Sequence, residues 1–103
     1  MVTDVNCKRP EECTNITEVR NEIDRIDDTI IELLSNRLQY VKEVVKYKGN
    51  SQDSIVAEDR RRAVLAGRRK WAEERGLDPD VIEDIYDRLI KYFISEEMKI
   101  KKI

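Results

Sequence analysis

The stretch from residue 16 to residue 47 repeats apolar residues at spacings of three and four. Written in heptads, its two seam positions are Ile16, Val19, Ile23, Ile26, Ile30, Leu33, Arg37, Tyr40, Val44 and Tyr47. Nine of these ten side chains are apolar or aromatic, and neither Gly nor Pro interrupts the stretch. The pattern predicts one continuous helix, which would be roughly 48 Å long at about 1.5 Å per residue.

A helix of that length is longer than one small domain can cover. The chain has 103 residues, and a compact domain of about 100 residues has a radius of gyration near 13 Å. Charged residues make up 41% of the sequence and apolar residues 40%, so the core that one chain can form is thin. The overhanging half of the helix needs a partner, and the simplest partner is the same helix of a second copy. We therefore predict an intertwined homodimer.

Breaker residues divide the rest of the chain. Residues 1–13 contain a proline and are predicted to be an irregular leader, followed by a single helical domain over residues 14–103. The cluster Gly49-Asn50-Ser51 predicts that the first helix ends near Lys48 and that residues 49–55 form a polar loop.

Two more helices are expected after the loop. The second runs from about Val56 to Arg75, and the third from about Pro79 to Ile100, with residues 99–103 expected to be a frayed tail. Gly76 is a typical residue just past a helix end, and Asp78 before a proline is a typical N-cap. The predicted fold class is all-α, with three helices per chain and a very long first helix.

Composition excludes several kinds of function. The net charge is −2, which does not favour nucleic acid as a partner. The sequence has no histidine, and its two cysteines, Cys7 and Cys13, both lie in the leader, so we expect no metal site, no cofactor and no histidine-activated nucleophile. It has neither a secretion signal nor a run of 18 apolar residues, which predicts a cytoplasmic protein without a membrane partner.

Three charged residues occupy otherwise apolar helix faces. Arg37 lies in the first seam, Arg60 lies on the stripe Val56, Arg60, Val64, Gly67 and Trp71, and Glu97 lies on the stripe Ile82, Tyr86, Ile90, Phe93, Glu97 and Ile100. The neighbours of Arg60 in sequence, Arg61 and Arg62, are expected to be solvated. The inward charges, with Lys48 at the end of the first helix, predict either a pocket for a small anion or a buried Arg–Glu network. Without a metal, histidine or nucleophile, such a pocket can bind, orient and stabilise charge.

Several motifs together resemble the all-helical chorismate mutase family over about residues 10 to 100. They are Val19-Arg20-x-x-Ile23-Asp24-x-Ile26-Asp27, Leu33-Leu34-x-x-Arg37 and Val41-Lys42 to Lys48. The sequence is most similar to the branch that contains the isochorismate-pyruvate lyases, as seen in Arg9-Pro10-Glu11-Glu12-Cys13-Thr14 and Lys70-Trp71-Ala72-Glu73-Glu74-x-Gly76-Leu77-Asp78. The resemblance implies three helices per chain and an intertwined dimer with two equivalent active sites.

The resemblance also implies roles for five residues. Arg20 would reach into the partner's site, Arg37 and Arg60 would bind the substrate, and Lys48 would contact a carboxylate and the ether oxygen. Glu97 matches a position where the family commonly has a glutamine that donates to the ether oxygen. A glutamate can donate there only when it is protonated.

Two reactions fit this resemblance. A mutase converts chorismate to prephenate by a Claisen rearrangement, and a lyase splits isochorismate into salicylate and pyruvate. Both substrates are dicarboxylates with an enolpyruvyl ether, so the cations do not separate the two. We expect the mutase first, the lyase as the alternative and a non-catalytic helical dimer as a third possibility. Ala57 and Arg61 stand where the family often has acidic residues, which leaves the contacts to the ring hydroxyl open.

Overall fold

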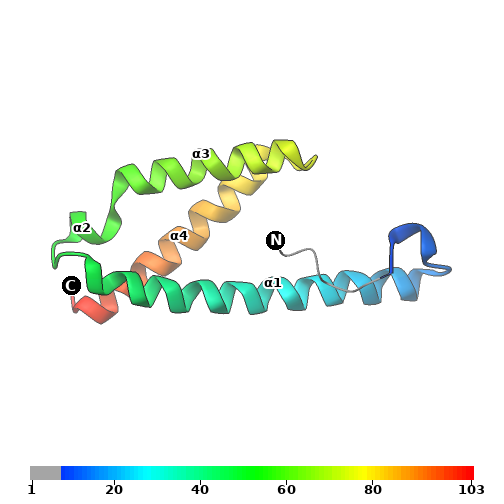
Figure 1. The fold of residues 1–103 in the computed structure, drawn as a ribbon, viewed down its shortest axis with the longest axis horizontal. Helices are drawn as coiled ribbons and strands as arrows, with labels where there is room; N and C mark the ends of the chain where they lie inside the picture. Colours follow the sequence, from blue (N-terminus) through cyan, green and yellow to red (C-terminus); the bar gives the residue numbers. More distant parts are fainter. Residues whose placement is uncertain (1–7) are drawn as a thin grey trace. The chain divides into compact units, whose positions relative to one another are not determined.

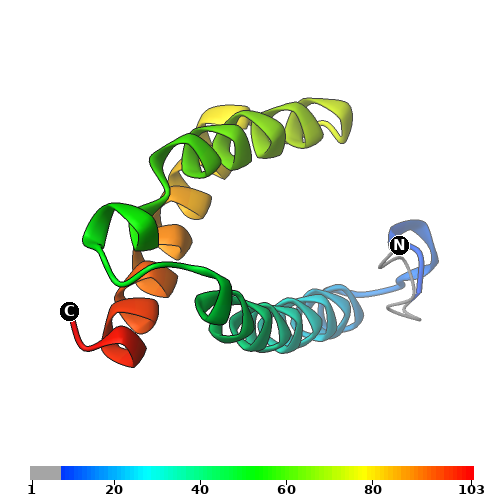
Figure 2. The same cartoon turned by 60° about the vertical axis from the view of Figure 1, so that its left-hand side comes forward.

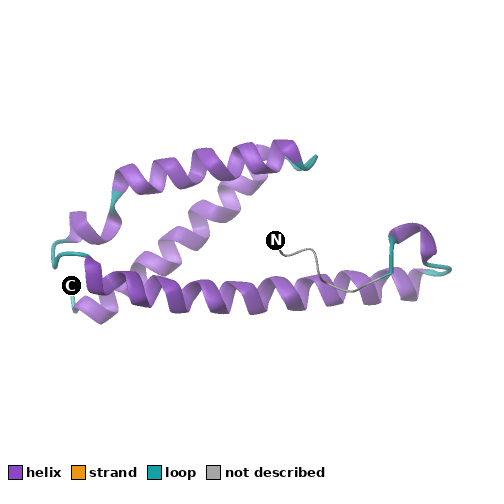
Figure 3. Ribbon diagram, viewed as in Figure 1, coloured by secondary structure: helices purple, strands orange, loops and turns teal. Residues whose placement is uncertain are grey.

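The computed structural model describes residues 8–103, and Cys7 lies outside this range. Within it every regular element is helical, as Figure 3 shows. In chain order (Figure 1) the elements are η1 (Pro10–Glu12), α1 (Ile16–Val44), η2 (Val45–Tyr47), α2 (Gln52–Val56), α3 (Glu58–Glu74) and α4 (Pro79–Lys101). The all-α prediction with three principal helices and a long first one is confirmed.

The chain forms two compact units, one that ends at Gln39 and one from Tyr40 to Ile103. A single domain over residues 14–103 therefore stays a prediction. In the described part of the predicted leader, Pro10–Glu12 forms a short 3-10 turn rather than irregular chain.

Helix α1 begins at a side-chain cap. The Asn15 side chain accepts a hydrogen bond from the Glu18 N–H at 2.9 Å, and the Glu18 carboxylate accepts one from the Thr14 N–H at 2.8 Å. The bond from Thr14 lowers the pKa of Glu18 below its usual value. The helix continues to Val44, and η2 extends it to Tyr47 as a tighter turn. The predicted span from residue 16 to 47 is confirmed, with its last turn in 3-10 form.

One copy of the chain leaves the apolar seam of α1 open to solvent. The helix has no buried residue, and Ile23 and Ile30 keep 51% and 47% of their surface exposed. Burying such a side chain stabilises a protein by about 1.5–3 kcal/mol. The exposed seam therefore supports the prediction that a second copy covers it.

In the second unit, α3 and α4 form an antiparallel pair joined by a short turn (Figure 2). Gly76 has a φ of +74°, a conformation that favours glycine, and the Leu77 N–H bonds the Ala72 carbonyl at 2.9 Å. The Asp78 carboxylate then accepts the Asp80 N–H at 2.9 Å and so caps α4. Both predicted helix boundaries at this turn are confirmed.

The core of the second unit is small. Its buried apolar side chains are Val45, Ile55, Val64, Ala72, Ile90 and Phe93. They come from η2, α2, α3 and α4, and α4 contacts each of the other three elements. Trp71, which we expected to face inward, keeps 50% of its surface exposed, and the Arg68 guanidinium lies 4.4 Å from its ring centre.

The predicted polar loop over residues 49–55 is largely a short helix, α2. The Ser51 side chain caps it by accepting the Ser54 N–H at 3.1 Å, and Ile55 is completely buried. Ala57 ends it with a φ of +47°, and α3 begins at the next residue. Residues 52–56 therefore pack into the second unit through the buried side chain of Ile55. The polar residues around Ile55 led us to predict a loop.

Candidate active site

Lys48 and Glu97 form the central pair of the candidate site. Lys48 follows η2 with extended backbone, and its Nζ lies 2.8 Å from Glu97 Oε1 and 2.9 Å from the Ile55 carbonyl oxygen. The Lys48 side chain is 22% exposed and the Glu97 side chain 5%. A carboxylate this well buried requires a charged or hydrogen-bonded partner, and Lys48 supplies it.

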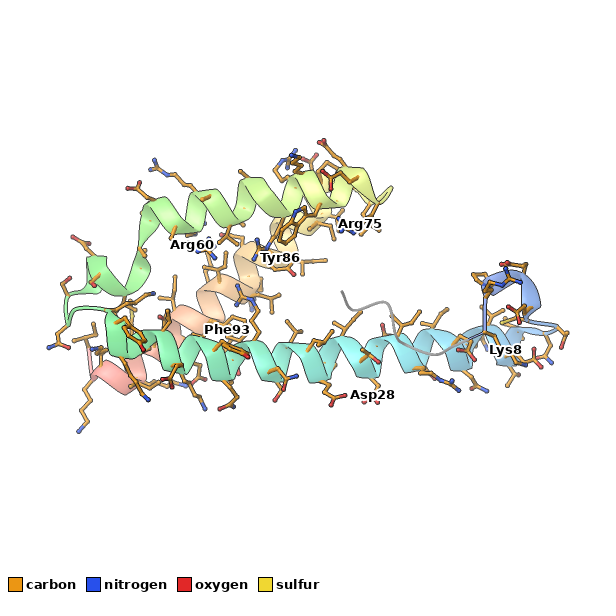
Figure 4. All side chains as sticks on the ribbon, viewed as in Figure 1. Lys8, Asp28, Arg60, Arg75, Tyr86 and Phe93 are labelled. Atoms are coloured by element: carbon orange, nitrogen blue, oxygen red, sulfur yellow. The ribbon has the colours of Figure 1, made fainter. Side chains whose placement is uncertain are left out.

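The sequence of α4 explains why Glu97 points inward. Ile90, Phe93 and Glu97 follow one another at steps of three and four, so they share one face of the helix, and all three are buried. Phe93, which Figure 4 labels, is four residues before Glu97 on α4. The inward position predicted for Glu97 is confirmed. Ile100, predicted on the same stripe, is 47% exposed.

The backbone of Lys48 is held as well as its side chain. The Lys101 ammonium donates to the Lys48 carbonyl oxygen at 3.0 Å, and the Gly49 N–H donates to the Ser54 hydroxyl at 2.8 Å. Sequence reasoning missed Lys101 because it assigned residues 99–103 to a frayed tail. The signal was its spacing of four from Glu97, which places both side chains on one face of α4.

We predicted that Arg60 faces inward and that Arg61 is solvated, and the structure shows the reverse. Arg60, labelled in Figure 4, is exposed, whereas the Arg61 side chain is only 25% exposed and bonds Asp87 of α4. Hydrogen bonds from Lys91 and Arg61 lower the pKa of Asp87, and the bond to Asp87 raises the pKa of Arg61. Arg61 therefore joins α3 to α4.

Two features account for this reversal: the buried residues of α3 are Val64 and Ala72 rather than Gly67 and Trp71, and the left-handed residue Ala57 separates α2 from α3. Our stripe ran from Val56 through Arg60 as if one helix contained both, but Val56 is the last residue of α2 and Arg60 belongs to α3. A positive φ at Ala57 turns the chain between the two helices, so the phase of α2 does not carry over into α3.

The other two predicted site residues belong to the first unit. Arg20 is exposed and Arg37 is half-buried, both on α1 before Gln39. Of the five residues, the structure therefore brings Lys48 and Glu97 into direct contact. Within residues 8–103, no group of three His, Cys, Asp or Glu side chains is arranged to hold a metal ion.

Chemically, the Lys48–Glu97 pair can present two hydrogen-bond donors to one oxygen atom. An ammonium has three donor hydrogens, and a carboxyl group has one when it is protonated. In a site that excludes water, donors fixed before the reaction stabilise negative charge as it develops. Neither group is a strong nucleophile in this arrangement, so the pair fits a reaction that proceeds by charge stabilisation.

The sequence model for chorismate mutase type II matches residues 19–98, which is most of the chain. The chain belongs to the chorismate mutase type II family. It is an enzyme of that family, and the segment matched contains all five predicted site residues.

Curated relatives of this chorismate mutase-type chain include a lyase and two T-proteins. An isochorismate pyruvate lyase of Pseudomonas aeruginosa is 40% identical over 92 residues, which cover 89% of this chain and 90% of the relative. T-proteins of Enterobacter agglomerans and Haemophilus influenzae are 37% and 35% identical over 82 residues. Those 82 residues are 80% of this chain and 22% of each T-protein, so the chain spans about a fifth of their length. None of the helices in residues 8–103 has the length and apolarity needed to span a membrane.

Proposed function

We propose that this chain is a chorismate mutase, which converts chorismate to prephenate by a Claisen rearrangement. The proposal rests on one observation, the contact of 2.8 Å between Lys48 and the buried Glu97 in a chain of this family. The reaction needs no metal or nucleophile. It needs a folded substrate and donors at the ether oxygen, where negative charge grows as the C–O bond breaks.

In this proposal the five charged residues bind the substrate or stabilise the charge that develops on it. Arg37 and Arg60 bind the two substrate carboxylates, and Arg20 completes the site from a second copy of the chain. Lys48 contacts a carboxylate and the ether oxygen. Glu97, in its protonated form, donates to the same ether oxygen. Together these groups hold a flexible dicarboxylate in a reactive conformation before the bond breaks.

The ligand-free pair has to rearrange when the substrate binds. In the free protein the Lys48 ammonium is bound to the Glu97 carboxylate and the Ile55 carbonyl. A substrate carboxylate replaces Glu97 as the negative partner of Lys48, and the Glu97 carboxyl group can then turn to the ether oxygen.

A second candidate is isochorismate-pyruvate lyase, in which the same donors assist breakage of the same kind of ether. It is favoured by the match to the P. aeruginosa lyase, which extends over 90% of that protein. The substrate class is the same in both cases, a dicarboxylate with an enolpyruvyl ether.

Turnover of both substrates by the purified full chain is the deciding experiment. Formation of prephenate from chorismate with the higher kcat/KM supports the mutase, and formation of salicylate and pyruvate from isochorismate supports the lyase. If neither substrate is consumed, both proposals are wrong and a non-catalytic helical dimer becomes the better explanation.

The protein should be a stable homodimer in solution, because one copy leaves the apolar side chains of the α1 seam exposed. Sedimentation velocity over a dilution series measures this directly. We expect one species of twice the chain mass of 12.2 kDa down to the lowest concentration that gives a signal. A folded, active monomer would contradict both the dimer and the role of Arg20 in a second copy's site.

Glu97→Gln should retain activity, because glutamine has nearly the same shape and supplies a permanent N–H donor to the ether oxygen. Comparison of kcat for the two proteins on one substrate tests this. An inactive Glu97→Gln would show that Glu97 is not the donor.

A further inference from the structure

The peptide group that joins Lys48 to Gly49 is held from both sides. Its carbonyl oxygen accepts a hydrogen bond from the Lys101 ammonium at 3.0 Å, and its N–H donates to the Ser54 hydroxyl at 2.8 Å. A peptide group is planar, so fixing its oxygen and its hydrogen fixes the whole plane. The backbone torsion on the C-terminal side of Lys48 is thereby determined.

Without these two bonds this peptide would have considerable freedom. Lys48 is the C-cap of η2 with φ −102° and ψ 151°: its N–H bonds the Val45 carbonyl at 3.1 Å, but the peptide that follows it is not part of the turn. The next residue is a glycine, which allows many backbone conformations. The η2 turn therefore fixes the N–H of Lys48, and the bonds to Lys101 and Ser54 fix the peptide on its C-terminal side.

The C-terminal end of α4 contacts both ends of Lys48. Glu97 binds the ammonium at 2.8 Å, and Lys101, four residues later, binds the carbonyl at 3.0 Å. Residues four apart lie one turn apart on the same helix face. Lys102, with a φ of +61°, ends the helix, and the Ile103 N–H bonds the Met98 carbonyl at 3.1 Å, so the turn that carries Lys101 has a regular cap.

We propose that Lys101 is a positioning residue for Lys48: by binding the carbonyl of Lys48, it holds the Lys48 ammonium beside Glu97 in the orientation that the reaction uses. This inference rests on the proposed function for its effect on turnover. Lys101 itself does not touch the substrate. The last turn of α4 thus helps to position the Lys48 side chain in the site.

The test compares three variants with the wild-type protein. Lys101→Met removes the donor, and Lys101→Arg keeps a cationic donor. Lys99→Met is the matched control, because Lys99 is on the same turn of α4 but its side chain is 72% exposed and pairs only with Glu96 among the described residues. If Lys101→Met does not fold, Lys101→Gln replaces it, because the glutamine side chain is too short to keep the same bond.

For Lys101→Met we expect kcat to fall about tenfold, as for the loss of one charge-assisted hydrogen bond, and KM to change less than about twofold. Lys101→Arg should recover most of kcat, and Lys99→Met should equal the wild type. A merely structural role would instead change thermal unfolding and leave kcat of the folded protein unchanged. A kcat for Lys101→Met equal to that of Lys99→Met would overturn the proposal.

Hydrogen exchange of the ligand-free proteins separates this inference from the proposed function. The amides of residues 49–55 should exchange about tenfold faster in Lys101→Met than in Lys99→Met, while α3 exchanges equally in both. If the wild type turns over neither substrate, the proposed function fails, and the exchange result alone decides whether Lys101 holds the peptide. Equal exchange in the two variants overturns the inference even if the wild type is active.

Discussion

Lys48→Met should lower kcat by about 10²–10³, because it removes a preformed donor from the ether oxygen. The same change leaves Glu97 without its ammonium partner at 4% exposure. Breaking a buried ion pair from one side costs about 3–5 kcal/mol, so the free energy of unfolding should fall by about 3 kcal/mol as well. Initial rates and urea unfolding at one fixed protein concentration measure the two effects.

A double variant separates the catalytic effect from the structural one. Adding Glu97→Gln to Lys48→Met removes the unpaired charge, so stability should recover while the rate stays low. Lys46→Met is the matched control, since the Lys46 side chain is 68% exposed and should affect neither quantity. If Lys48→Met keeps its rate within about twofold of the wild type, Lys48 does not act on the substrate.

Arg37→Ala should lose nearly all turnover, with kcat/KM lower by at least about 100-fold. Arg37 is the one charged residue among the ten seam positions of α1, and it is half-buried. A guanidinium can bind a carboxylate through two parallel N–H bonds, and alanine supplies none of them. Steady-state kinetics with circular dichroism checks that the helices remain.

Arg37→Lys tests whether the shape of the guanidinium matters. Lysine keeps the charge and loses the two-pronged geometry, so we expect a loss of about tenfold, between the wild type and Arg37→Ala. Arg25→Ala is the control on the same helix, because the Arg25 side chain is 53% exposed. Wild-type kinetics in Arg37→Ala would mean that Arg37 has a structural role and that the pocket lies elsewhere.

Features set by residues close together in the sequence were predicted correctly. The seam spacing indicated α1, and Gly76 and Asp78 marked the turn between α3 and α4, since each acts on hydrogen bonds within a few residues. The inward side of Glu97 followed from its phase on an uninterrupted helix. Local physical chemistry was sufficient for these features.

The sequence was insufficient where two helices meet without a proline or glycine to mark the break. Alanine is rarely left-handed, so nothing in its type indicated the turn at Ala57. Within α3, Trp71 favoured the face that includes Arg60, whereas the buried residues are Val64 and Ala72 and it is Arg61 that binds Asp87. The anchor at Lys101 was missed for a different reason. Residues 99–103 were expected to fray, and although its spacing from Glu97 places Lys101 on the same face of α4, a sequence pattern does not identify its partner, the backbone carbonyl of Lys48.

The contacts of Lys48 have a consequence for the order in which the chain folds. Lys48 is separated by 49 positions from Glu97 and by 53 from Lys101, whereas the caps of the α3–α4 pair act over a few residues. Closing a longer segment of chain loses more conformational entropy, and contacts close in sequence form sooner. The paired helices can therefore form before Lys48 reaches α4. Lys48 and Glu97, to which we assign the chemistry, should therefore come together late, and under mild denaturation they should separate while most of the helical structure persists.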